Sequence, residues 1–291
     1  MDRSRLKRWF HAASALLALA GVAFVALRIA DYAAQINVSH FGAATWVWLG
    51  LLVFAYGAAN ILLARAWWQL LKQFQLHTPW PWALKTYGTT QINKYIPGNI
   101  FHLAGRQALG MSAGMAARPL AKSTLWELAL LALLGGLYGT LAAPLAWSQI
   151  SPVAAVALWA ALLAGGYSAL NRLGARAVAR AMGWQVGFLI VSGAVFIAIL
   201  WVTNRTSAMA YAAWPALCGA YVLAWLAGLV TPGAPAGVGV REAVLLLLLG
   251  GQFAQADLLV AVVLGRAVTA SGDLLFYLHA LSIPTRTLAH D

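Results

Sequence analysis

The sequence predicts an all-α polytopic membrane protein, with about 7–8 transmembrane helices and two re-entrant segments that enter the bilayer without crossing it. Two observations support this fold class. Of the 291 residues, 62% are hydrophobic and 9% are charged, whereas a soluble domain has about 45–50% apolar and about 25% charged residues. The apolar residues also form long runs, and two of these runs are broken by Pro and Gly. No hydrophilic stretch is long enough for a soluble domain, so residues 1–291 are expected to form a single transmembrane domain.

Seven runs approach or exceed the length of about 20 apolar residues that a membrane-spanning helix needs. They are Phe10–Ala30, Thr45–Leu63, Thr124–Pro144, Val153–Leu170, Val186–Val202, Met209–Val230 and Leu258–Leu281. The basic start of the chain predicts a cytoplasmic N-terminus, and Asn171–Trp184 reads as a short helical connector on the cytoplasmic side because it carries three Arg at a spacing of four. The composition fits a bacterial-type inner (plasma) membrane.

The two interrupted runs share a pattern. Each contains Pro-Gly, then seven residues, then Arg, then Gln or Glu, then Ala; the first match begins at Pro97 and the second at Pro232. This register predicts an internal repeat, with halves at about 45–145 and about 185–281. The residues that define the motif are Pro97, Gly98, Pro232, Gly233, Pro235, Gly237 and Gly239.

Broken backbone at membrane depth is tolerated only where it is buried in protein or lines a water-filled cavity, so both segments are expected to border a polar cavity. The apolar run Ala243–Leu249 is too short to cross a bilayer and is expected to be a half-helix. Four spans between the segments would make both open on the same side, whereas an odd number would give a mirror-related arrangement.

The residues Pro235–Ala243, followed by a leucine run and by Arg266 in the next helix, resemble the membrane domain of the lysylphosphatidylglycerol synthase/flippase family. The stretch Tyr95–Arg106 is similar to that family's first signature. The resemblance implies a stand-alone, flippase-like membrane domain that translocates or presents a lipid. It does not imply lysyl transfer, because in the aminoacylating members a soluble domain performs that chemistry.

Candidate substrate-binding residues are the ionisable side chains that lie in or beside apolar runs, where charge is rare and usually functional. Arg106 and Arg241 follow the two breaks, and His102 lies one turn before Arg106. Near a half-helix N-terminus, Arg favours a phosphate or a carboxylate. The remaining candidates are Glu127, Glu242, Arg266 and Asp273. Glu127 and Asp273 are interpreted as partners of these arginines, as carriers of a coupling proton or as members of structural ion pairs. Glu242 is interpreted as a cap of nearby backbone N–H groups or as a partner of an arginine.

Other residue types have simpler interpretations. Trp67, Trp68, Trp80 and Trp82 are typical of the aromatic belt at a membrane interface. The histidines are scattered without ligand spacing, so neither a metal nor a cofactor is expected. The net charge of +12 is spread thinly beside the ends of the spans, which favours anionic lipid surfaces over nucleic acid.

The leading functional hypothesis is a non-enzymatic flippase or carrier. It would bind the anionic head group of a phospholipid or of a polyprenyl-phosphate-linked (lipid-linked) glycan in a central polar cavity. The alternatives are a membrane-embedded glycosyl or phosphoryl transferase with Asp31 as its base, and an accessory scaffold for a partner synthase or glycosyltransferase.

Overall fold

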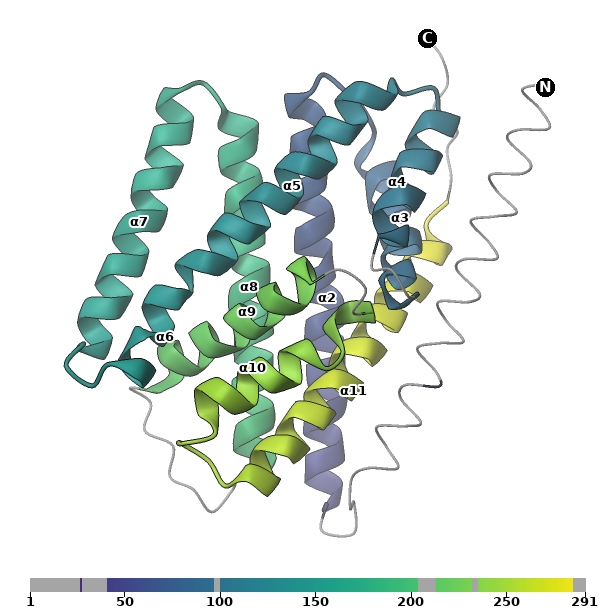
Figure 1. Cartoon of the computed structure of the whole chain (residues 1–291). Helices are drawn as coiled ribbons and strands as arrows, with labels where there is room; N and C mark the ends of the chain where they lie inside the picture. Colours follow the sequence, from purple (N-terminus) through teal and green to yellow (C-terminus); the bar gives the residue numbers. More distant parts are fainter. Residues whose placement is uncertain (1–26, 28–40, 97–99, 204–212, 232–234, 285–291) are drawn as a thin grey trace.

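The computed structural model describes residues 27, 41–96, 100–203, 213–231 and 235–284, and within these ranges the regular structure is entirely helical (Figure 1). Five helical segments are long and apolar enough to cross a membrane: Ala43–Gln73, Ala117–Ala146, Pro152–Arg172, Arg176–Thr203 and Ala256–Ser282. The described part of the chain is therefore consistent with an all-α, multi-pass membrane protein. The expected span Phe10–Ala30 lies outside the described residues, apart from Leu27.

Three long helices form the centre of the fold. Helix α2 (Ala43–Gln73) packs along α8 (Arg176–Thr203) and crosses α11 (Gln255–Ser282). The α2–α11 crossing is close because Gly57 and Gly272 face each other: a Cβ built on Gly57 would lie 3.0 Å from the Gly272 carbonyl oxygen. Small residues allow such backbone approach between membrane helices, where hydrophobic burial alone does not bring helices together.

The first interrupted segment folds as a helical hairpin. Its descending arm is α3 (Trp80–Gln91), extended by the 3₁₀ turn η2 (Ile92–Tyr95), and its returning arm is α4 (Phe101–Ser112). The helical path ends at Ile96, which has φ −69° and ψ 135°. This extended conformation is the one that a residue before proline prefers.

The second interrupted segment forms another hairpin, from α9 (Trp214–Val230), the 3₁₀ turn η4 (Pro235–Gly237) and α10 (Val240–Leu249). The turn contains three positive φ angles: 48° at Ala236, 74° at Gly237 and 84° at Gly239. Glycine adopts this left-handed region without steric penalty, which explains the two motif glycines. The half-helix expected over Ala243–Leu249 is α10, which begins at Val240.

The tips of the two hairpins meet in the middle of the molecule. The first hairpin opens at the upper end of Figure 1 and the second at the lower left. The turns η2 and η4 are in contact, and Ile92, Tyr95, Ala236 and Ala270 form a small apolar cluster at their junction. The arms therefore approach from opposite ends of the molecule.

Of the two arrangements that the sequence left open, the described hairpins match the one with an odd number of intervening long segments. Three long segments separate the hairpins: α5 (Ala117–Leu137) continued by α6 (Gly139–Ala146), then α7 (Pro152–Arg172), then α8. The run expected as a fourth span, Met209–Val230, is described over Trp214–Val230 and forms an arm of the second hairpin. In both predicted halves the order is a long helix, a hairpin and a long helix.

The connector expected over Asn171–Trp184 is much shorter in the structure. Arg172 is the last residue of α7, and Arg176 and Arg180 already belong to the first turns of α8. The chain reverses direction over 173–175, where Gly174 has φ 76°. The regular Arg spacing therefore belongs to the end of one long helix and the start of the next.

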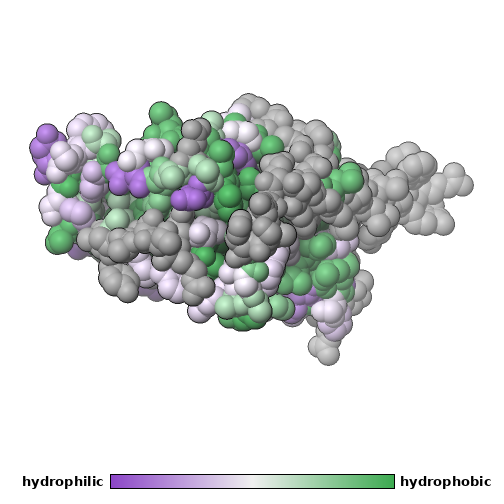
Figure 2. All heavy atoms as spheres, turned by 90° about the horizontal axis from the view of Figure 1, so that it is seen from below, coloured by the Kyte–Doolittle hydropathy of each residue, from purple (hydrophilic) through white to green (hydrophobic). Residues whose placement is uncertain are grey.

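The peripheral basic residues of the described chain gather at one end. Eight Lys and Arg lie outside the centre, all at the end where α2 finishes and α8 begins: Arg65, Lys72, Lys85, Arg118, Lys122, Arg172, Arg176 and Arg180. Figure 2 looks onto the opposite end, where strongly hydrophilic colour is confined to small separate patches of the described surface. Among the described residues, the two ends of the molecule thus differ in their content of Lys and Arg.

Candidate functional site

A polar cavity of about 50 Å³ lies where the hairpin tips meet the long helices. Its polar and charged lining comes from six elements: α2, α3, η2, α4, α5 and α10. These lining residues are Tyr56, Tyr87, Gln91, Lys94, His102, Arg106, Glu127 and Arg241. One water molecule needs roughly 10–15 Å³ of such a cavity, so the cavity has room for about four waters.

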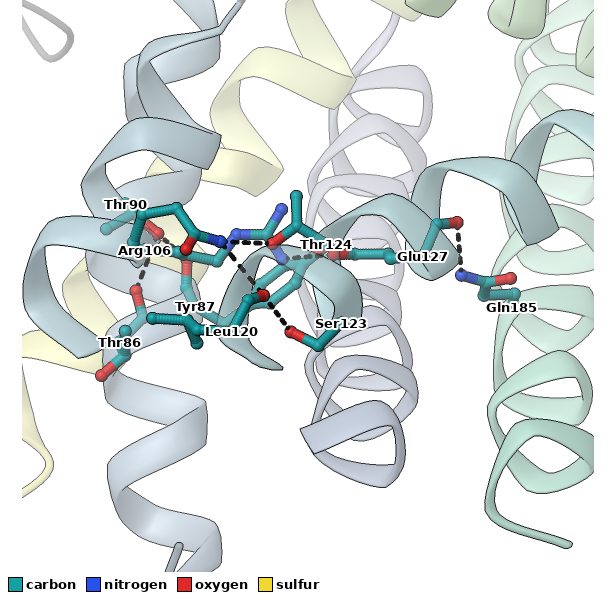
Figure 3. A network of polar contacts seen from close by, with 10 residues as sticks. Thr86, Tyr87, Thr90, Arg106, Leu120, Ser123, Thr124, Glu127 and Gln185 are labelled. Carbon is teal, nitrogen blue, oxygen red and sulfur yellow. Dashed lines mark hydrogen bonds and ion pairs between the residues drawn. The ribbon is translucent and has the colours of Figure 1, made fainter. Parts of the chain in front are cut away.

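Arg106 and Glu127 form a buried ion pair on one wall of the cavity (Figure 3). The guanidinium Nη1 donates to Glu127 Oε2 at 2.7 Å, and the Tyr87 hydroxyl donates to Oε1 at 2.9 Å. Arg106 and Glu127 are 2% and 1% exposed. The Arg106 guanidinium also lies 4.4 Å from the Tyr87 ring centroid and 5.4 Å from that of Trp67. Aromatic rings and a carboxylate thus surround Arg106, and its Nε has no hydrogen-bond partner.

Asp273 of α11 binds the tip of the first hairpin. Its Oδ2 accepts from Lys94 Nζ at 2.7 Å and from the Tyr95 hydroxyl at 2.6 Å. Asp273 is 1% exposed, and its Oδ1 has no hydrogen-bond partner. A second, smaller cavity borders Asp273 and shares Lys94 and Arg241 with the first cavity. The carboxylate therefore pairs with a lysine of the hairpin tip, whereas the sequence suggested an arginine.

Arg266, two helical turns before Asp273 on α11, binds the turn of the second hairpin. Its Nη1 donates to the Ala236 carbonyl at 2.8 Å and its Nη2 to the Gly237 carbonyl at 2.6 Å. Its Nε and Nη2 also donate to the two carboxylate oxygens of Glu242, at 2.6 and 3.2 Å. Because residues seven apart share a helix face, α11 holds both hairpin tips on one side.

Arg241 is the cation of the site with no ion-pair partner among the described residues. Its guanidinium lies 5.8 Å from the ring centroid of Trp225, and its Nε is buried without a hydrogen-bond partner. Its side chain borders both central cavities. Gly228 makes room for it, because a Cβ built there would lie 2.9 Å from Arg241 Nε. The second hairpin therefore presents one uncompensated guanidinium to the cavity.

His102 also lines the cavity, is 7% exposed, and has no hydrogen-bond partner at Nδ1.

Of the motif residues, Pro235, Gly237 and Gly239 lie in and just after η4. Pro97, Gly98, Pro232 and Gly233 lie outside the described residues, as does Asp31, the proposed base of the alternative transferase. The helix N-termini nearest the two breaks, at Phe101 and Val240, have no side-chain cap.

Several site residues escaped the sequence analysis. Lys94, Tyr95, Tyr56 and Tyr87 were not singled out, although all four are polar residues in or near apolar runs. Trp67 was assigned to the interfacial belt, and this interpretation is wrong: Trp67 is 0% exposed, with its ring 6.2 Å from that of Trp82. One signal was available in the sequence: Trp67 lies two helical turns after Asn60, a polar residue inside an apolar run, and therefore shares a helix face with it.

Neither the family models nor the curated proteins searched contain a match to this chain. The described residues hold no group of three or more His, Cys, Asp or Glu placed to bind a metal ion. The resemblance to the lysylphosphatidylglycerol synthase/flippase family therefore stays a prediction from the two motifs.

Proposed function

We propose that this chain binds the anionic head group of a membrane lipid in its central cavity and carries it across the bilayer. The observation that carries the proposal is Arg241, whose guanidinium has no carboxylate partner in the described part of the chain and borders the cavity that Lys94 and Arg106 also line. Desolvating an unpaired charge is expensive, so such a residue favours binding of an anion. The planar guanidinium can donate two parallel hydrogen bonds to a phosphate, which a lysine cannot do.

The hairpins act as re-entrant segments that meet near the middle of the bilayer. Helices α3 and α4 have 12 residues each and α10 has 10, which gives lengths of about 15–18 Å at 1.5 Å per residue. The hydrocarbon core is about 30 Å thick, so each of these arms extends roughly half-way. A polar cavity at that depth reduces the penalty of taking a charged head group through hydrocarbon, while the lipid tails stay in the bilayer.

The end that carries the eight peripheral Lys and Arg faces the cytoplasm, in accordance with the positive-inside rule. The first hairpin then opens to the cytoplasm and the second to the outer side of a bacterial-type inner membrane. Opposite openings around a fixed central site suit alternating access, in which one hairpin at a time moves away from the cavity.

The test replaces Arg241 in purified protein reconstituted into liposomes that contain fluorescent (NBD-labelled) phosphatidylglycerol. Dithionite bleaches only the outer leaflet, so the rate at which inner-leaflet label is lost measures translocation. Arg241→Ala should lower this rate about 100-fold, the effect of losing about 3 kcal/mol of charge-assisted hydrogen bonding. Arg241→Lys should keep part of the activity because it keeps the charge.

The matched control is Arg176→Ala, which removes an exposed arginine at the basic end of the molecule. This variant should translocate lipid at the wild-type rate. If Arg241→Ala inserted normally and moved the labelled lipid as fast as wild type, the proposal would be wrong.

A further inference from the structure

The charged side chains around the two central cavities do not sum to zero. Among the described residues, the cations are Lys94, Arg106, Arg241 and Arg266, and the carboxylates are Glu127, Glu242 and Asp273. Histidine, with an ordinary pKa of about 6.5, is mostly neutral at pH 7, so His102 is not counted. Four cations against three carboxylates leave one net positive charge.

This sum does not depend on where the protons are within the pairs. The three short contacts are Arg106–Glu127 at 2.7 Å, Lys94–Asp273 at 2.7 Å and Arg266–Glu242 at 2.6 Å. If a proton moved from Lys94 to Asp273, the pair would still carry no net charge. Arginine keeps its proton in proteins. The surplus charge is therefore that of Arg241, at the tip of the second hairpin.

A ligand that brings one negative charge makes the site neutral. A ligand that brings two negative charges leaves one of them uncompensated in a largely desolvated site. Phosphate esters differ in this respect. A phosphomonoester carries about −1.5 to −2 charges at pH 7, because its second pKa is about 6. A phosphodiester carries a single charge. The cavity of about 50 Å³ has room for the oxygens of one phosphate group.

We infer that the site selects a lipid phosphodiester with one negative charge over a phosphomonoester or a diphosphate. The inference rests on the proposed transport function and specifies its substrate class. Two membrane lipids have this chemistry, namely a glycerophospholipid such as phosphatidylglycerol and a polyprenyl phosphate esterified to a sugar. A monoester is smaller than the corresponding diester, so exclusion by size would favour the monoester, whereas the charge balance favours the diester.

The experiment measures translocation in proteoliposomes for two pairs of fluorescent lipids. One pair is phosphatidylglycerol and phosphatidic acid with the same tails, and the other is a polyprenyl-phosphoryl-glucose and its polyprenyl monophosphate. At pH 8, the wild-type protein should move at least one diester tenfold or more faster than its monoester partner. The lipid pair that shows this preference identifies the source of the phosphodiester.

Variants that remove one carboxylate should shift the preference toward the monoester, because the site then has a net charge of +2. Asp273→Asn and Glu127→Gln change different walls of the site, so either one suffices if the other fails to fold. Each should raise the monoester-to-diester ratio of rates at least tenfold. The control is Asp257→Asn, which removes an exposed carboxylate from the first turn of the same helix, α11, and should leave the ratio unchanged.

The outcomes separate this inference from the proposed function. If wild-type protein moves diesters and monoesters at equal rates, or if neither carboxylate variant changes the ratio, the charge balance does not set the specificity and the inference is overturned. In that case the transport function still stands. If wild-type protein moves none of the four lipids, the proposed function fails as well.

Discussion

Replacing Arg266 by Met should weaken the junction between the second hairpin and α11. The substitution keeps most of the apolar stem and removes the hydrogen bonds from the guanidinium to Glu242 and to the carbonyls of Ala236 and Gly237. Breaking a buried ion pair by removing one partner costs about 3–5 kcal/mol. Because the Glu242 side chain is 25% exposed, water offsets part of this loss, and we expect the lower value of about 3 kcal/mol.

The measurement is reversible unfolding in dodecyl maltoside micelles with increasing SDS, followed by the fluorescence of the 14 Trp residues. A double-mutant cycle with Glu242→Met isolates the pair. The double variant should be more stable than the sum of the single effects predicts, by about 1–3 kcal/mol, because it leaves no orphan carboxylate. The exposed Arg176→Met should change the free energy of unfolding by less than about 0.5 kcal/mol.

Two results would refute this reasoning about Arg266. One is a wild-type free energy of unfolding for Arg266→Met. The other is a cycle in which the two substitutions add within about 0.5 kcal/mol, which is the behaviour of sites that do not interact.

Two further predictions concern the hairpins. Gly228→Ala should lower the rate of phosphatidylglycerol translocation tenfold or more, because the new Cβ would lie 2.8 Å from Arg241 Cγ and 2.9 Å from Gly237 Cα. Gly136→Ala is the neutral control, because a Cβ built on Gly136 has no atom within 4 Å. Undiminished transport by Gly228→Ala would contradict the role of this close approach. In a Cys218→Ala background, Gln252→Cys should react with a membrane-impermeant maleimide in intact cells, whereas Ala116→Cys should react only after permeabilisation. Both residues are exposed, in the α10–α11 and α4–α5 connectors, and labelling of both from one side would contradict the proposed topology.

Much of the candidate site could be found in the sequence because many of its residues differ in type from the apolar residues around them. Pro and Gly inside an apolar run interrupt a helix wherever they occur, so the breaks near Tyr95 and Thr231 could be located without a structure. An ionisable residue inside such a run is equally easy to find, and Glu127 and Asp273 were selected for this reason, whereas Arg106 and Arg241 were selected because they follow the two breaks. Lys94 escaped because it precedes the Pro-Gly break, outside the stretch in which the two segments match.

The composition and the apolar runs by themselves determined the all-α membrane class. With 9% charged residues, the chain has too few polar side chains to cover the surface of water-soluble domains. Apolar runs of this length satisfy their backbone hydrogen bonds in a membrane by forming helices. Only the tertiary structure decided which charges neutralise each other. The Tyr95–Asp273 contact joins residues 178 apart in sequence, and it exists because both hairpin tips pack against one face of α11. Packing of α3 against α2 buries Trp67, whose ring contacts Trp82 and Tyr87. Among the described residues, Arg241 has no carboxylate partner. Hydropathy patterns describe each segment separately, whereas ion pairing depends on where several segments meet.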